Sequence, residues 1–263
     1  MAFIACTKQE KKANQSAEQK QESTTSAAPS DKSEPNPQKK ASAKKEKNAP
    51  PKLSNENVKA FLTRYGQKHS AGKFKIATAK GDIVIRLFEN TPLHRANFLY
   101  LTQQGYWNNT WFYRVSKGHV IQAGNTDEQA TLDKRIALGD YTVPAEIGKH
   151  HHATGAVAMV RSYKNNPNKR SDPYEFYITL GEKYSAAELR AMEKQQDFDF
   201  NQRQEKLYIT KGGAPHLDGE HTVFGKVIEG MEVVRAISKV EVDPGEWPLD
   251  NIPIQVKVFE SKQ

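Results

Sequence analysis

The feature that most constrains the fold is a series of short segments in which apolar and polar residues alternate. Phe74 and Ile76 alternate with Lys73 and Lys75, a Lys80-Gly81 turn follows, and Ile83, Ile85 and Leu87 resume the same spacing. Successive side chains of a strand point to opposite faces, so this period of two predicts a β-hairpin with one buried face.

Only two helices are expected among the strand-like runs of this region. One begins at Thr91-Pro92, a capping residue followed by Pro at the first helical position, and runs to about Gly105; the other covers 231–237. Many short strands with few helices between them predict an antiparallel sheet closed on itself, not a βαβ fold. The remaining strand-like runs are 111–115, 119–122, 155–159, 175–179, 222–227 and 254–258.

Two further segments have helical patterns. Val58, Phe61, Leu62 and Tyr65 follow the i, i+3, i+4, i+7 spacing of an amphipathic helix. A Ser185-Ala-Ala-Glu188 capping box opens a Gln-rich stretch that extends to about residue 207. We therefore predict an N-terminal helix and linker over 53–72 and a helical insertion over about 181–211.

The segment from Thr7 to Lys52 contains no Val, Leu, Ile, Phe, Trp or Tyr, so it cannot bury enough apolar surface to offset its conformational entropy. Residues 1–52 are predicted to be a disordered tether. They hold eleven Lys and six acidic residues, and so account for +5 of the net charge of +8. The basic charge lies mainly in this tether and not on a folded face, which argues against a nucleic-acid partner.

Cys6 is the single cysteine, which excludes an intramolecular disulfide framework and a cysteine-based zinc cluster. The preceding residues, Met-Ala-Phe-Ile-Ala, resemble the end of a bacterial lipoprotein signal, although its charged start and most of its apolar stretch are missing. Lipidation of Cys6 would anchor the protein in the cell envelope, whereas an accidental Cys in a flexible tail would leave it cytoplasmic. No apolar run reaches the roughly 18 to 20 residues of a membrane span, which excludes an integral membrane protein.

The motif Phe112-Tyr113-Arg114-Val115, followed by Gly118 and by Ile121-Gln122-Ala123-Gly124, resembles the cyclophilin family of peptidyl-prolyl isomerases. The resemblance implies one domain over 73–263 with a closed eight-stranded antiparallel barrel, capped by two helices and carrying its site on the outer face. Further matching motifs follow the family order at 97–98, 155–159, 175–178, 217–219 and 223–227.

The same resemblance assigns roles to individual residues. It implies Arg114 and Gln122 as catalytic residues and proline-containing polypeptides as partners of a monomer that needs no cofactor. The expected substrate-binding residues are Phe112, His119, Val120, Val160, Arg161, Glu175, Tyr177, His216, Leu217 and His221.

The chemistry can also be argued from the residues themselves. Rotation about a peptide bond meets a barrier of about 18 to 20 kcal/mol because the nitrogen lone pair is delocalised into the carbonyl. A donor that localises this lone pair on nitrogen lowers the barrier, and an arginine is always charged and offers several fixed donors. The reaction requires no nucleophile, metal or cofactor.

Departures from the family pattern leave a second function open. His119 stands where Phe is usual, Val120 where Met is usual and Glu175 where Gln is usual. A polar wall and an added negative charge would weaken proline binding, so the alternative is a catalytically weak module that binds proline peptides. The run 150–152 of three histidines is expected to be solvated and not to bind a metal.

Overall fold

The computed structural model describes residues 51–196 and 199–259, all within the compact unit Pro50–Gln263. Cys6 and almost all of the predicted tether lie outside the described residues.

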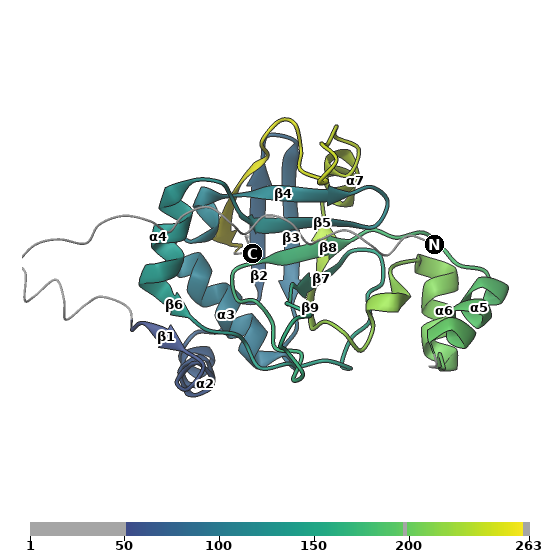
Figure 1. Ribbon diagram of the computed structural model, residues 1–263, viewed down its shortest axis with the longest axis horizontal. Helices are drawn as coiled ribbons and strands as arrows, with labels where there is room; N and C mark the ends of the chain where they lie inside the picture. The colour runs from purple at the N-terminus through teal and green to yellow at the C-terminus, as the bar shows by residue number, and fades with distance from the viewer. Residues whose placement is uncertain (1–50, 197–198, 260–263) are drawn as a thin grey trace, which may run out of the picture. The chain divides into compact units, whose positions relative to one another are not determined.

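Eight strands close into an antiparallel barrel in the order β10-β2-β3-β9-β7-β8-β5-β4, as expected (Figure 1). Two short strands outside it, β1 (Leu53–Ser54) and β6 (Gly139–Asp140), pair in parallel. The barrel strands are β2 (Lys73–Thr78), β3 (Gly81–Leu87), β4 (Thr110–Ser116), β5 (Val120–Asn125), β7 (Ala156–Met159), β8 (Phe176–Thr179), β9 (Val223–Glu229) and β10 (Pro253–Val258).

The alternation of side chains divides the buried residues into two groups. Phe74, Ile76 and Ile121 belong to the interior of the barrel, where they pack with residues of the capping helices. Val120 and Tyr177, one residue away from inward positions on β5 and β8, belong to a separate cluster with Ala156, Ala158 and Val223. This second cluster lies on the outer face and provides an apolar floor there.

The part of the chain that the structure describes has six α-helices beside the barrel, and none of them is both long and apolar enough to cross a bilayer. Helix α2 packs on α3 outside the barrel, with Val58 and Leu62 fully buried, as the amphipathic pattern predicts (Figure 1). The helices are α2 (Val58–Lys68), α3 (Pro92–Gln103), α4 (Gln129–Leu138), α5 (Ala186–Gln196), α6 (Gln202–Lys211) and α7 (Met231–Ile237).

Helix α4 was not expected from the sequence. Only Thr131 and Leu138 are buried along it, whereas Leu132 and Ile136 are exposed, so its apolar residues do not indicate a buried face. Its first turn also lacks a side-chain cap. The helix is instead fixed by Arg135, whose guanidinium donates to the carbonyl oxygen of Gly124 at 2.8 Å.

The predicted insertion consists of two helices that project beyond one end of the barrel (Figure 1). Ser185 and Glu188 form the expected capping box at the start of α5. A second capping box, between Asn201 and Gln204, begins α6. The single helical stretch inferred from the sequence is therefore divided into two helices. The helices share a small apolar core formed by Leu189, Phe200 and Tyr208.

Candidate active site

A β-bulge in β4 turns Arg114 to the outside of the barrel. Phe112 pairs with Ala123 and Arg114 pairs with Gln122, so β4 contains one residue more than β5 at this point. Such a bulge changes the direction in which the following side chains point. Phe112 therefore lies fully buried in the barrel core, and the expectation that it binds substrate is wrong.

The Arg114 guanidinium has two polar partners. Its Nη1 donates to Oε1 of Gln122 at 3.4 Å, and its Nη2 lies 2.5 Å from Oε2 of Glu246. The side chains of Arg114 and Glu246 are 39% and 38% exposed. Arg114 is thus held in position by two acceptors while the rest of its donors face solvent and the adjacent cavity.

A cavity of about 180 Å³ lies beside Arg114 on the outer face of the barrel. Its apolar wall comes from Val120 and Tyr177, which are almost fully buried, and from the partly buried Val160 and Leu217. The structure thus brings together most of the residues implied by the resemblance. The complete lining is Arg114, His119, Val120, Gln122, Val160, Arg161, Tyr163, Tyr177, Leu217 and His221.

Glu175 lies behind Gln122 and does not line this cavity. Its carboxylate accepts hydrogen bonds from the Tyr113 hydroxyl at 2.5 Å and from Gln122 Nε2 at 3.3 Å. Arg135 of α4 forms an ion pair with it at 3.2 Å. The expectation that Glu175 contacts substrate and weakens proline binding by its charge is not supported, because Arg135 compensates that charge.

His119 and His216 form a pair at the edge of the cavity. Their Nε2 atoms are 3.0 Å apart, and the two rings are nearly parallel. Burial lowers the pKa of His119 to about 4, with further lowering from His216 and Arg114, and burial also lowers the pKa of His216. Both imidazoles are therefore neutral near pH 7, so this wall of the cavity is polar but uncharged.

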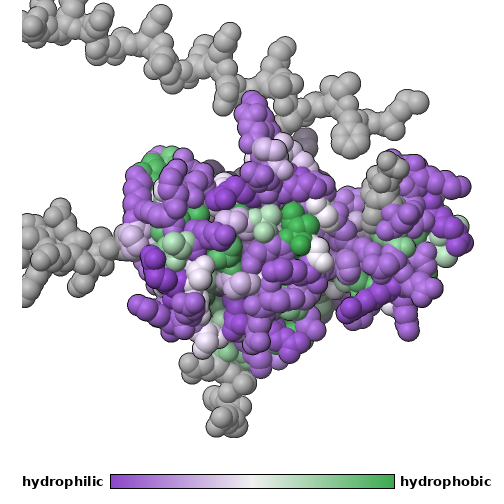
Figure 2. All heavy atoms as spheres, turned by 90° about the horizontal axis from the view of Figure 1, so that it is seen from below, coloured by the Kyte–Doolittle hydropathy of each residue, from purple (hydrophilic) through white to green (hydrophobic). Residues whose placement is uncertain are grey.

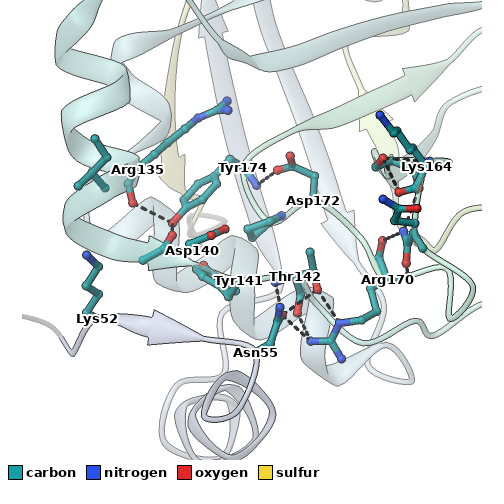
Figure 3. A pocket seen from close by; sticks show the side chains of 16 residues that line it. Lys52, Asn55, Arg135, Asp140, Tyr141, Thr142, Lys164, Arg170, Asp172 and Tyr174 are labelled. Carbon is teal, nitrogen blue, oxygen red and sulfur yellow. Dashed lines mark hydrogen bonds between the residues drawn. The ribbon is translucent and has the colours of Figure 1, made fainter. Parts of the chain in front are cut away.

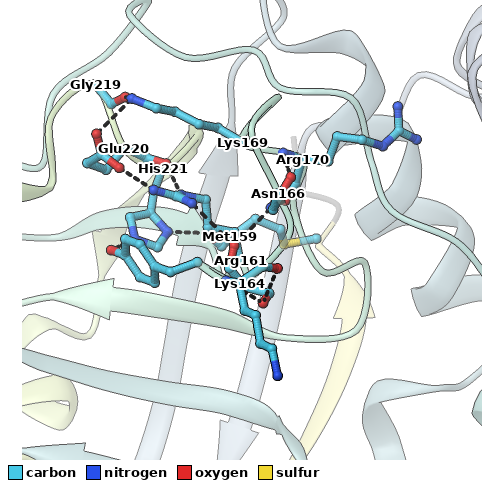
Figure 4. A network of polar contacts seen from close by, with 11 residues as sticks. Met159, Arg161, Lys164, Asn166, Lys169, Arg170, Gly219, Glu220 and His221 are labelled. Carbon is cyan, nitrogen blue, oxygen red and sulfur yellow. Dashed lines mark hydrogen bonds and ion pairs between the residues drawn. The ribbon is translucent and has the colours of Figure 1, made fainter.

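Arg161 and His221 are engaged in a polar network next to the cavity (Figure 4). The Arg161 guanidinium donates to the backbone oxygen of Glu220 at 2.6 Å, forms an ion pair with its carboxylate and stacks on the ring of Tyr163 at 4.0 Å. The Tyr163 hydroxyl lies 2.8 Å from Nε2 of His221. Burial lowers the pKa of His221 to about 4, and Nδ1 of its neutral ring donates to the backbone oxygen of Met159 at 3.2 Å, so Nε2 accepts from the Tyr163 hydroxyl.

A larger hollow, of about 710 Å³, lies elsewhere and contains none of the predicted site residues (Figure 3). Several of its polar side chains pair with one another. Asn55 Oδ1, for example, accepts hydrogen bonds from Thr142 and from Arg170. The smaller cavity is the better candidate site because it combines an apolar wall with an arginine whose donors are partly free.

The three consecutive histidines are all hydrogen-bonded within the protein, and His152 is fully buried, so the expectation that the run is solvated is wrong for this residue. His150 Nε2 lies 2.7 Å from Oδ1 of Asn90, whereas His151 and His152 both bond to Asp218. Within residues 51–196 and 199–259, no group of three or more His, Cys, Asp or Glu side chains is arranged to hold a metal ion.

Sequence reasoning missed Glu246, Tyr163 and Arg135. Glu246 follows Pro244-Gly245, which indicates a turn but not its place beside Arg114. Tyr163 is 65% exposed, and only the structure shows that it lines the cavity. Arg135 belongs to the helix that had no clear sequence signal.

The position of Glu246 leads to a prediction about substrate preference. Glu246 is paired with Arg114, but its side chain is 38% exposed, whereas that of Glu175 is 13% exposed, so a bound peptide can approach the Glu246 carboxylate. It should therefore favour peptides with Lys near the proline over peptides with Glu there. Two unit charges about 4 Å apart interact by about 1 kcal/mol in bulk water and by about 4 kcal/mol near a protein surface. In Glu246→Gln, the ratio of kcat/KM for the Lys peptide to that for the Glu peptide should fall by about 5-fold.

Raising the salt concentration should reduce this ratio in the wild type and leave it nearly unchanged in Glu246→Gln, because salt screens the interaction of exposed charges. Equal ratios for the wild type and the variant at low salt would show that Glu246 has no influence on substrate choice.

Comparisons with known proteins match the chain to one family. The model of the family described as cyclophilin type peptidyl-prolyl cis-trans isomerase/CLD matches residues 73–258. A Staphylococcus aureus protein whose name places it among the peptidyl-prolyl cis-trans isomerases is 28% identical over 187 residues, which cover 70% of this chain and 90% of that protein.

Two further similarities cover about three quarters of this chain. The mouse peptidylprolyl isomerase domain and WD repeat-containing protein 1 is 27% identical over 205 residues, but this chain spans only 26% of its length. A crystal structure of a Cryptosporidium parvum cyclophilin type isomerase, determined in the presence of the dipeptide Ala-Pro, has a TM-score of 0.51 at 24% identity and covers 72% of this chain and 99% of its own. The barrel, the order of the motifs and the match over residues 73–258 lead to one conclusion: the chain belongs to the cyclophilin-type peptidyl-prolyl cis-trans isomerase family.

Proposed function

We propose that the protein accelerates cis–trans rotation about Xaa-Pro bonds in polypeptides without forming a covalent intermediate. One observation carries the proposal: the Arg114 guanidinium lies beside Gln122 at the edge of an apolar cavity of about 180 Å³ on the outer face of the barrel. A cavity of this size suits a proline ring, and its position on the outer face leaves it open to a polypeptide.

Each part of the site has a role in lowering the rotational barrier. Val120, Tyr177 and Leu217 hold the proline ring while the rest of the peptide turns. Arg114 donates to the proline nitrogen as its lone pair becomes localised, and so stabilises the rotating state more than either planar state. Gln122 holds Arg114 over the cavity through the contact of Oε1 with Nη1.

An isomerisation assay on a tetrapeptide with one Xaa-Pro bond tests this proposal. The expected result is a clear acceleration over the uncatalysed exchange. The alternative, a module that binds proline peptides and hardly accelerates their exchange, is favoured by the polar His119–His216 wall and by the pairing of Arg114 with Glu246. Binding of the peptide without acceleration would support that alternative, and absence of binding would contradict both.

We further propose that the protein acts as a monomer on proline-containing polypeptides. On the face shown in Figure 2, hydrophilic residues dominate and apolar residues form only small, separate patches. Such a face is typical of a surface that stays in contact with water.

We also propose that Cys6 is lipidated and that the protein is anchored in a bacterial cell envelope, with the isomerase domain held away from the membrane. The support comes from the sequence: Phe3-Ile4-Ala5 precedes Cys6, and the segment from Thr7 to Lys52 contains no large apolar residue that would pack on a fold. A lipidated cysteine followed by a polar tether would let the catalytic domain contact polypeptides at some distance from the membrane surface.

This anchor gives a second prediction. Protein isolated from its native cells should partition into the detergent phase and carry a diacylglycerol mass on Cys6, because acyl chains contribute about 0.8 kcal/mol of membrane affinity per buried CH₂. The Cys6→Ser variant should move to the aqueous phase with unchanged isomerase activity. Native protein with an unmodified Cys6 in the aqueous phase would contradict the anchor.

A further inference from the structure

A continuous chain of hydrogen bonds links the helical insertion to the wall of the proline cavity. The Tyr208 hydroxyl, from α6, donates to Oδ2 of Asp218 at 2.6 Å. Oδ1 of Asp218 accepts from Nδ1 and from the backbone N–H of His152, both at 2.9 Å. Nε2 of His152 lies 2.9 Å from the hydroxyl of Tyr177, whose ring lines the cavity.

The direction of each hydrogen bond in this chain is defined by the ionisation of its members. Burial acts to raise the pKa of Asp218, but hydrogen bonds from His151, His152 and Tyr208 outweigh it and hold that pKa well below its usual range. Burial lowers the pKa of His152. A neutral His152 that donates from Nδ1 to the carboxylate must accept at Nε2, so the Tyr177 hydroxyl donates to it.

The chain is shielded from water along its whole length. Tyr208 and the side chain of His152 are 0% exposed, the side chain of Asp218 is 6% exposed and Tyr177 is 4% exposed. A buried network in which every member has its partners is rigid, because removing one partner leaves another group unsatisfied. The hydroxyl of Tyr177 and the position of Leu217, next to Asp218, are therefore fixed together.

The backbone connects the same elements a second time at the base of the insertion. The chain enters the insertion near Gly181 and leaves it near Gly213. These two backbone segments approach so closely that a Cβ on Gly181 would lie 1.8 Å from the carbonyl oxygen of Gly213. Gly213 N–H donates to Glu182 at 3.1 Å, and Ala214 N–H donates to the backbone oxygen of His152 at 2.8 Å. The insertion is thus joined directly to the segments that carry Tyr177 on one side and Leu217 on the other.

We propose that the insertion of α5 and α6 positions the wall of the proline cavity, with Tyr208, Asp218 and His152 as positioning residues that act on Tyr177 and Leu217. A ligand that binds or displaces α6 would then alter the affinity of the site for proline peptides while leaving the arginine chemistry unchanged. This inference rests on the proposed isomerase function for its kinetic readout.

The test uses Tyr208→Phe in the full-length protein. Phenylalanine keeps the ring in the core of the insertion and removes only the hydroxyl that reaches Asp218. We expect KM, and the Kd of the same tetrapeptide measured by calorimetry, to rise about 2- to 10-fold, the range expected for one lost hydrogen bond. The value of kcat should stay within about 2-fold, because Arg114 and Gln122 are not part of the chain.

Tyr184→Phe is the matched control. Tyr184 packs against the same small core, but its hydroxyl forms no hydrogen bond with any of the described residues. This variant should keep the wild-type KM and Kd. An equal rise in both variants would assign the effect to the core of the insertion and overturn the positioning chain.

A second pair of variants tests the middle of the chain. The amide of His152→Gln can still donate to Asp218 and accept from Tyr177, whereas His152→Leu can do neither. The expected outcome is a nearly normal Kd for the first and a raised Kd for the second. A wild-type Kd in both Tyr208→Phe and His152→Leu would overturn the inference. If the wild-type protein binds the peptide but does not isomerise it, the proposed function is contradicted. The positioning chain would still be tested, because it is judged from the Kd values of the variants.

Discussion

Replacement of Arg114 by Ala is expected to lower kcat/KM for Xaa-Pro isomerisation by about 100-fold or more, the range seen when a preorganised donor to a transition state is removed. The guanidinium is the only cation among the residues at the cavity with donors left partly free, because Arg161 is bound to Glu220 and stacked on Tyr163. No other cavity residue among those described can take over its role at the proline nitrogen.

The free energy of unfolding should hardly change in Arg114→Ala. The lost ion pair with Glu246 is more than one third exposed on both sides, and such pairs contribute about 0 to 1 kcal/mol. Urea unfolding would measure this, and Arg114→Lys serves as the matched variant because it keeps the charge but loses the planar fork of donors. A folded Arg114→Ala protein with wild-type kcat/KM would refute the assignment of Arg114.

The barrel could be predicted from the sequence because its signal is local. Alternation in 73–87 and 254–258 places every second side chain in the core, and the structure has strands at each of the expected runs. The helices at 58–68 and 231–237 carry their apolar residues on one face, and both are confirmed. The packing of a strand or helix face is encoded within a few residues, so no contact across the fold is needed to see it.

The site was less predictable because its geometry depends on contacts between distant segments. Sequence spacing puts Phe112 and Arg114 on the same face of β4, and only the bulge separates them. The charge of Glu175 appears unfavourable until Arg135, 40 residues away, is seen beside it. Glu246 reaches Arg114 from a loop 132 residues further along the chain. The roles assigned to the remaining cavity residues stay predictions until variants are assayed.

The second large effect expected is a loss of stability in mild acid. Burial lowers the pKa values of His94 and His152, which are fully buried and hydrogen-bonded to Glu146 and Asp218, and those of His119 and His221 to about 4. These rings are neutral in the folded protein, whereas in the unfolded chain they gain a proton below about pH 6.5. The unfolded state then binds more protons than the folded state, so the free energy of unfolding must fall as the pH drops from about 6.5 towards 4.

Asp172 opposes this trend. Burial and the charge of Glu175 raise its pKa to about 6, so it takes up a proton in the folded state before it does so in the unfolded chain. Between about pH 6 and pH 4 its protonation adds stability, but one carboxyl acts against these four histidines and His216, whose pKa is also lowered. Below about pH 4, Glu146 and Asp218 become protonated in the unfolded chain before they do so in the folded protein, because their folded pKa values are lowered, and this adds to the loss of stability.

The pH dependence can be separated into these contributions by urea unfolding at pH 7.5, 6.0 and 5.0. His94 and His152 alone should give a slope of about 3 kcal/mol per pH unit once the unfolded chain is fully protonated and the folded rings are not. His94→Gln or His152→Gln should flatten the curve by about half of that slope, since an amide replaces the hydrogen bonds but does not titrate. Asp172→Asn should steepen the curve because it removes the opposing protonation. A free energy of unfolding that stays constant from pH 7.5 to pH 5.0 would mean that the buried histidines take up protons as readily in the folded protein as in the unfolded chain, and would contradict the lowered pKa values of these rings.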